Sequence, residues 1–189
     1  MTKNETYLVT PSLLNSWLYI YEVEDEYVEK AYQDFITTLK REPTEPNEFM
    51  LRGIEFEDEC VRGENPDISP IIKDGCFQVV CKKEINVGGF NFLMYGRMDV
   101  VKDGVIYDIK RVSKYERPKY NWSCQHQFYL ELVPMAKHFE YLIHTGKAFY
   151  KEKYQYDNER TIPNIIMFFI NFLKQRNLLN IYLEKWRSK

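Results

Sequence analysis

The chain has 189 residues, of which 44% are hydrophobic and 16% aromatic, and its formal net charge is −2. These values exclude a disordered chain and a polycation, and they predict one globular domain over residues 1–189. The charges are nevertheless segregated: acids outnumber bases 13 to 4 from residue 22 to 59, whereas bases outnumber acids 10 to 6 from residue 110 to 160. Two interpretations fit, a basic half that faces a polyanion and an ordinary mixed surface.

The predicted elements begin with three helices, at about residues 10–21, 27–39 and 48–61, where apolar residues recur every three or four positions. The period then changes to two, which predicts strands at 76–85, 90–101 and 105–112. A helix at 120–132, strands at 137–144 and 148–156, and one long helix at 163–186 complete the chain. This order predicts an α/β (α+β) fold with a mixed central sheet flanked by helices.

Cysteines and apolar runs point to an intracellular protein. The four cysteines lack the C-x-x-C spacing of a zinc site, so we expect reduced thiols. The N-terminal residues show no basic-then-apolar signal pattern, and the apolar run at 165–170 is too short to cross a bilayer. We therefore expect a cytoplasmic location and no membrane partner.

Two acids lie inside the strands that flank Asp103-Gly104, a dipeptide typical of a two-residue type I′ hairpin turn. This turn sets a register in which Asp99 lies opposite Asp108, with Lys110 on the same face. Opposed carboxylates repel, so either one is protonated or a cation lies between them. A solvent-facing polar side of an amphipathic hairpin is the alternative. The other face is expected to be core: Met98, Val100, Tyr107 and Ile109.

Glu57 lies in the third predicted helix, on an apolar stripe. The stripe consists of Met50, Ile54, Cys60 and Val61. A carboxylate on a buried stripe is costly unless it is paired or binds a metal. The alternative is a boundary glutamate paired with a base.

Together these motifs resemble the PD-(D/E)XK nuclease superfamily, specifically its RecB-like exonuclease branch. The pieces occur in the order of that branch: TPSLLNSWLYIYE, RGIEFED, YGRMD, YDIK and QHQFY. The resemblance covers about residues 10–145 and implies a restriction-endonuclease-like core. It divides the domain into an N-terminal helical part (1–50), a catalytic core (51–145), and a C-terminal strand and helix (146–189).

The resemblance also implies roles for individual residues. Asp99 and Asp108 would ligate Mg²⁺ or Mn²⁺, with the Ile109 carbonyl and Glu57 completing the site. Lys110 would position or activate the attacking water, and the reaction would be phosphodiester hydrolysis. Gln125 and Tyr129 lie one helical turn apart and would face the site and substrate. Relatives with an iron–sulfur cluster place three cysteines near the C-terminus; no cysteine follows Cys124, so no cluster is expected.

Bases alternate with aromatic residues directly after the D-x-K triplet. The residues are Lys114, Arg117, Lys119, Tyr120 and Trp122. Such basic side chains can hold phosphates, while the aromatic rings stack on the nucleobases of a single strand. DNA, possibly with a single-stranded end, is thus the expected partner, and an ordinary basic loop is the alternative. This chain has no room for an ATPase, so it would act alone or with a helicase or recombination protein.

The leading hypothesis is therefore a Mg²⁺- or Mn²⁺-dependent DNA exonuclease for recombination, repair or phage DNA processing. A structure-specific endonuclease is the rival within the enzyme class. A catalytically silent nucleic-acid- or protein-binding module on the same fold, or an antagonist of a host nuclease system, is the rival outside it. The silent module is disfavoured because all four catalytic positions are filled.

Overall fold

The structure is a computed structural model that describes residues 5–188. Its helices are α1 (Pro11–Leu18), α2 (Val28–Lys40), α3 (Glu48–Arg62), α4 (Ser69–Ile72), α5 (Gln125–Leu132), α6 (Ile162–Gln175) and α7 (Leu179–Lys185). Its strands are β1 (Thr6–Val9), β2 (Cys76–Val87), β3 (Phe90–Lys102), β4 (Val105–Arg111), β5 (His138–His144) and β6 (Phe149–Tyr154). Two short 3₁₀ turns, Tyr19–Tyr21 and Asp25–Tyr27, connect α1 to α2.

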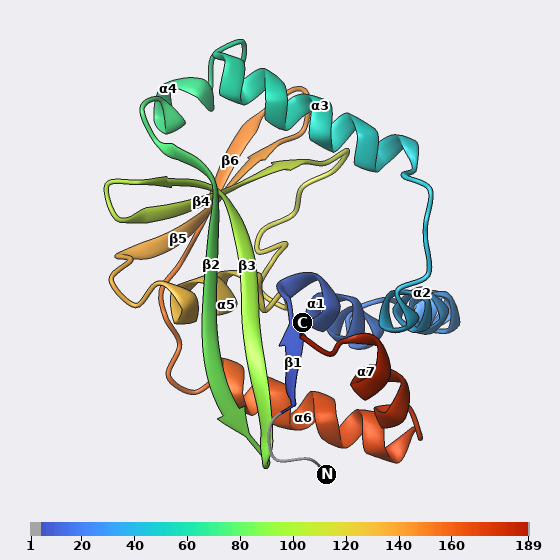
Figure 1. The fold of residues 1–189 in the computed structure, drawn as a ribbon. Coiled ribbons are helices and arrows are strands. Elements are labelled where there is room, and N and C mark those ends of the chain that lie inside the picture. Colours follow the sequence, from blue (N-terminus) through green and yellow to red (C-terminus); the bar gives the residue numbers. More distant parts are fainter. Residues whose placement is uncertain (1–4, 189) are drawn as a thin grey trace.

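The strands form one mixed sheet in the order β1-β3-β4-β5-β6, with β2 paired to β3. Strands β2, β3 and β4 form an antiparallel meander, whereas β1 runs parallel to β3 and β4 runs parallel to β5. The parallel β4–β5 pair requires a crossover, and residues 112–137, which include α5, provide it. This topology is the mixed sheet flanked by helices that the sequence predicts (Figure 1).

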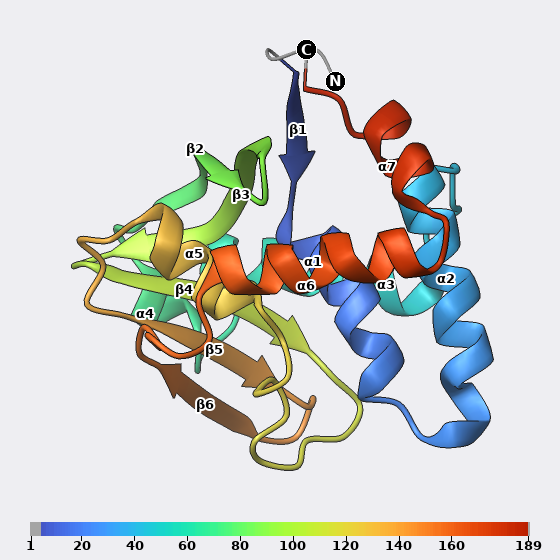
Figure 2. The same cartoon turned by 90° about the horizontal axis from the view of Figure 1, so that it is seen from below.

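Two hydrophobic clusters hold helices against the sheet. The larger one joins α1, α2, α5, α6 and α7 to β1, β3 and β5, and the smaller one joins α3 and α4 to β3, β4 and β5. Figure 2 shows α6 running alongside α1 towards α2 and α7, away from the sheet. Because β4 contributes Ile106 to the larger cluster and Ile109 to the smaller one, it is covered from both sides. Asp108, which lies between these two residues in β4, is therefore shielded from water.

The predicted order of elements needs correction in three places. Strand β1 was not predicted, because a four-residue strand is recognisable only by its parallel partner β3. The single closing helix is wrong: it is divided into α6 and α7 at Asn177, whose φ of 58° is left-handed and ends α6. Helix α5 begins at Gln125 rather than at residue 120, since residues 120–124 form turns.

The predicted apolar stripe of α3 is right for Cys60 but wrong for its other three residues. Met50, Ile54 and Val61 are exposed by 54%, 57% and 43%, whereas Phe56 and Cys60 are buried. The N-terminal half of α3 extends beyond the sheet, so its apolar residues have no surface to pack against (Figure 1). The face that does pack is set by Phe56 and Cys60, which join Val100, Ile109 and Leu142 in the smaller cluster.

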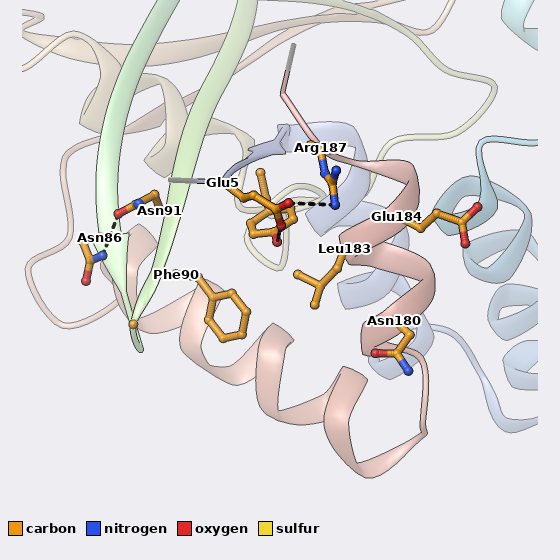
Figure 3. Close-up of a pocket in the computed structure, with 10 residues that line it drawn as sticks. Glu5, Asn86, Phe90, Asn91, Asn180, Leu183, Glu184 and Arg187 are labelled. Carbon is orange, nitrogen blue, oxygen red and sulfur yellow. Dashed lines mark hydrogen bonds and ion pairs between the residues drawn. The ribbon is translucent and has the colours of Figure 1, made fainter. Parts of the chain in front are cut away.

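A surface cavity of about 580 Å³ lies between α7 and the far end of the β2–β3 hairpin (Figure 3). Phe90 and Leu183 line it, and an ion pair of 3.0 Å joins Arg187 to Glu5 at its edge. None of the sequence-predicted site residues lines this cavity.

Within residues 5–188, no helix combines the length and the apolar character needed to cross a bilayer.

Candidate active site

The candidate site lies where β3 changes partners. Strand β1 pairs with residues 91–94 of β3, and β4 pairs with residues 100–102. Between these two ladders, residues 95–99 have no strand on that edge. The backbone groups of this gap need other partners. The YGRMD motif, Tyr95–Asp99, fills the gap completely.

The predicted hairpin register is confirmed. Asp103 and Gly104 have φ angles of 52° and 80°, as a type I′ turn requires. The paired residues are Lys102 with Val105, Val101 with Ile106, and Val100 with Tyr107. The next pair in this register would be Asp99 with Asp108, but the ladder ends before it. The two acids therefore stand at the point where the strands separate.

The face prediction for this hairpin holds only in part. Met98, Val100 and Ile109 are buried as expected, and Tyr107 is half-buried. They do not share one core, however, because Met98 belongs to the larger cluster whereas Val100 and Ile109 belong to the smaller one. The acid-bearing face is not a wet surface either, since Ile106 is fully buried. The solvent-facing alternative is thus wrong for β4.

Of the three predicted catalytic acids, Glu57, Asp99 and Asp108, the last is the most enclosed, with 2% of its surface exposed. Gln125 donates a hydrogen bond of 2.5 Å from Nε2 to its Oδ1. Lys110 Nζ forms an ion pair of 2.7 Å with the buried Oδ2. Burial raises the pKa of Asp108, because the charged carboxylate loses water that its neighbours only partly replace.

Asp99 uses its side chain to replace the missing strand pairing. Its Oδ2 accepts a hydrogen bond of 3.0 Å from the Ile109 backbone N–H. Burial, and then repulsion from Asp108, raises the pKa of Asp99 to about 8. The two acids are thus close enough to oppose each other's ionisation, as the register predicts.

Lys110 is the cation nearest to both acids. Burial alone would lower the pKa of Lys110, but attraction to Asp108 and Asp99 outweighs burial and raises it. The side chain keeps 30% of its surface exposed, so its ammonium group can reach a bound substrate. The raised pKa keeps Lys110 positively charged beside the two acids, where it can donate hydrogen bonds.

Glu57 reaches the site from α3. Burial, and then repulsion from Asp108, raises the pKa of this half-buried glutamate. The alternative prediction, in which Glu57 pairs with a basic residue, is wrong. Gln78 of β2 instead donates a hydrogen bond of 2.5 Å from Nε2 to Glu57 Oε1. Glu57 consequently keeps its negative charge uncompensated by a direct ion pair.

Helix α5 holds both strands at the point of separation. Gln125 bonds to Asp108 of β4, and Tyr129 donates a hydrogen bond of 2.7 Å to the Arg97 carbonyl of β3. Gly96 permits this approach, since a Cβ at that position would lie 2.5 Å from the Tyr129 ring. Because Tyr129 is only 5% exposed, the structure shows it supporting the strand rather than presenting a free face to substrate.

The start of α5 is fixed by Asn15 of α1. Its Oδ1 accepts a hydrogen bond of 2.9 Å from the Cys124 N–H, and its Nδ2 donates one of 2.9 Å to Ser123 Oγ. Ser123 Oγ in turn accepts from the Gln125 N–H. The side chain that contacts Asp108 is therefore positioned from the N-terminal helix.

The basic segment forms an exposed loop beside this site. Lys114, Arg117 and Lys119 are exposed, and Lys114 is paired with Glu116. The two aromatic side chains are less available than predicted: Tyr120 stacks on Tyr141 at a centroid distance of 4.5 Å, and Trp122 packs on Tyr19 at 5.4 Å. One face of each ring is thus already covered by protein.

Buried Glu152 of β6 anchors this loop. Its carboxylate accepts hydrogen bonds from the backbone N–H groups of Lys119 (2.7 Å) and Tyr120 (3.2 Å) and from the Tyr154 hydroxyl (2.6 Å). The sequence analysis missed both Glu152 and Gln78. Glu152 stands in an alternating charged run, KEKY, whose pattern does not reveal which face is covered.

A divalent cation is implied by the resemblance. Among residues 5–188, no group of three or more acidic, histidine or cysteine side chains is arranged to hold a metal ion. Glu57, Asp99 and Asp108 each accept a hydrogen bond from the protein. The donor chemistry still fits a hard cation, for two reasons. Three carboxylates repel one another here, and carboxylate oxygens are the ligands that a hard cation prefers. Glu57, Asp99 and Asp108 are the residues that would hold the ion; the Ile109 carbonyl stays a prediction.

No protein-family model and no curated protein matches the sequence. Solved structures do match. The crystal structure of SSO0001 is 19% identical, with a TM-score of 0.60 over 89% of this chain and 78% of that one. The alkaline exonuclease LHK-Exo from Laribacter hongkongensis is 16% identical, with a TM-score of 0.54 over 93% of this chain and 89% of that one.

At these identities the likeness concerns the fold, and membership of the RecB-like branch stays a prediction. The fold and the sheet topology agree with the order of motifs along the chain. The chain shares the fold of SSO0001 and LHK-Exo, a mixed sheet flanked by helices that is consistent with a restriction-endonuclease-like core, and membership of the PD-(D/E)XK superfamily also stays a prediction.

Proposed function

We propose that this protein is a Mg²⁺- or Mn²⁺-dependent deoxyribonuclease that acts from DNA ends. The observation that carries the proposal is the convergence of Asp99, Asp108, Lys110 and Glu57 where β3 and β4 separate. A solved structure with this fold, LHK-Exo, is named an alkaline exonuclease, which supports the same class of activity.

The three carboxylates would hold the cation, which, when bound, polarises the phosphate and lowers the pKa of its water. Lys110 would orient an oxygen of water or phosphate and stabilise the charge that develops on the phosphate, because its ammonium stays protonated. Gln125 keeps Asp108 in place through its amide. The exposed bases Lys114, Arg117 and Lys119 would bind the phosphates of the strand that leads into the site.

The structure favours this assignment over the silent module. A binding module has no need for closely placed acids that oppose each other's ionisation, and such a group is costly to keep. Ends are proposed as the substrate because LHK-Exo is an exonuclease by name. A structure-specific endonuclease is the alternative that experiment must distinguish from an exonuclease. Recombination, repair or phage DNA processing is the biological process in which we propose that the enzyme acts.

The test uses end-labelled linear duplex, single-stranded and covalently closed circular DNA, with Mg²⁺, Mn²⁺ or EDTA. We expect linear DNA to be degraded from its ends with either cation, and circles to survive. Asp108→Asn should remove activity, whereas Asp103→Asn, at the exposed turn of the same hairpin, should keep it. Activity that survives EDTA or Asp108→Asn would refute the site, and a cut circle would favour the endonuclease.

A further inference from the structure

Gln78 lies in strand β2, but its backbone has a left-handed conformation that a strand does not need. Its φ is 51°, in the left-handed region, which is sterically unfavourable for a non-glycine residue. The described residues include four other non-glycine residues with positive φ, and each ends a helix or lies in a turn: Arg41, Asp74, Asp103 and Asn177. Gln78 alone in this group lies within a strand, β2.

The distortion is confined to one residue. The β2–β3 ladder keeps a single register on both sides, with Phe77 paired to Val100 and Val79 to Met98. The pair missing between them is Gln78 with Asp99. The strand is therefore distorted opposite a predicted catalytic acid and nowhere else in the ladder. Strained non-glycine residues of this kind concentrate at functional sites.

The side chain explains why glutamine stands there. Glycine would adopt this φ without steric cost, but it could not donate the hydrogen bond of 2.5 Å that Gln78 Nε2 makes to Glu57 Oε1. A lysine or arginine could donate as well, but its charge would neutralise the glutamate and compete with a cation. A neutral amide fixes one oxygen of Glu57 and leaves the negative charge in place.

We propose that Gln78 is a positioning residue, which orients Glu57 for binding the divalent cation. This inference rests on the proposed function and names a residue that lies outside the sequence motifs. Partners that orient a metal ligand in this way typically contribute about 10- to 100-fold to metal affinity or activity. The strain at Gln78 is then the structural cost of placing that amide.

The test compares Gln78→Gly and Gln78→Asn with the wild type. Glycine removes both the strain and the amide, whereas asparagine tolerates the left-handed region but is one methylene shorter. Mn²⁺ affinity is measured from the electron paramagnetic resonance signal of the free ion, alongside thermal unfolding and DNA digestion. We expect Gln78→Gly to unfold at or above the wild-type temperature, yet to bind Mn²⁺ about 10- to 100-fold more weakly. Gln78→Asn should weaken Mn²⁺ binding similarly.

Asp74→Gly is the matched control, since Asp74 has a φ of 64° in the exposed turn before β2. It should share the change in stability and keep the wild-type affinity for Mn²⁺. Wild-type affinity in Gln78→Gly or Gln78→Asn overturns the inference. If the wild type binds Mn²⁺ but cuts no DNA, the proposed function fails and the Mn²⁺ titration alone decides on Gln78. If the wild type binds no Mn²⁺, both proposals are overturned.

Discussion

Gly96→Ala tests the packing that joins α5 to β3. The new Cβ would lie 2.5 Å from Tyr129 Cε1 and 2.9 Å from Leu132 Cδ1, whereas carbon atoms in contact prefer about 3.5–4.0 Å. The Tyr129 ring must therefore move by about 1 Å, and overpacking of this kind costs about 1–3 kcal/mol. For a chain of this length the unfolding midpoint should fall by about 2–12 °C.

The same substitution should reduce nuclease activity more than stability alone would. Helix α5 carries Gln125, and a misplacement of about 1 Å can lower a rate about 100-fold. Differential scanning fluorimetry and digestion of linear DNA, below the unfolding midpoint, measure the two effects separately. Gly53→Ala is the control, because nothing lies within 4 Å of its added Cβ and alanine favours the helix. The reasoning is refuted if Gly96→Ala matches the wild type in both assays.

Three further predictions follow. Because its pKa is raised to about 8, Asp99 stabilises the folded state below about pH 4 and loses this contribution as pH rises through 8. In EDTA, Asp99→Asn should therefore raise the unfolding midpoint more at pH 9 than at pH 5. Mn²⁺ at 100 times its Kd should stabilise the wild type by about 2.7 kcal/mol, but not Asp108→Asn; equal shifts would contradict the site. Glu152→Gln should weaken single-stranded DNA binding in a fluorescence anisotropy titration, whereas exposed Glu159→Gln should not.

Local chemistry made the centre of the site predictable. The Asp103-Gly104 turn fixes the hairpin register by itself, and this register brings Asp99 and Asp108 together. The QHQFY motif was placed on a helix correctly, since Gln125 and Tyr129 both reach the hairpin from α5. These features depend on residues close in sequence or on spacing along one element.

Features set by distant contacts could not be predicted in the same way. The buried face of α3 depends on how far the sheet extends beneath it, so Ile54 is exposed and Phe56 is buried despite similar hydrophobicity. Gln78 gives no signal, because its left-handed backbone is stabilised by the fold rather than by its own propensity. Glu152 is similar, since only the returning loop shows that its carboxylate is needed.

The ladder between β3 and β4 has a consequence for the order of folding. Only three residue pairs join these strands, whereas the whole of β4, including Asp108, pairs with β5 across the connection of residues 112–137. Closing a long connection is slower than forming a hairpin, so the meander β2–β3–β4 should nucleate first. Substitutions at the Asp103-Gly104 turn should then slow refolding, whereas those at Gln125 should mainly accelerate unfolding. The nascent chain would thus complete its core hairpins before it assembles the proposed catalytic site.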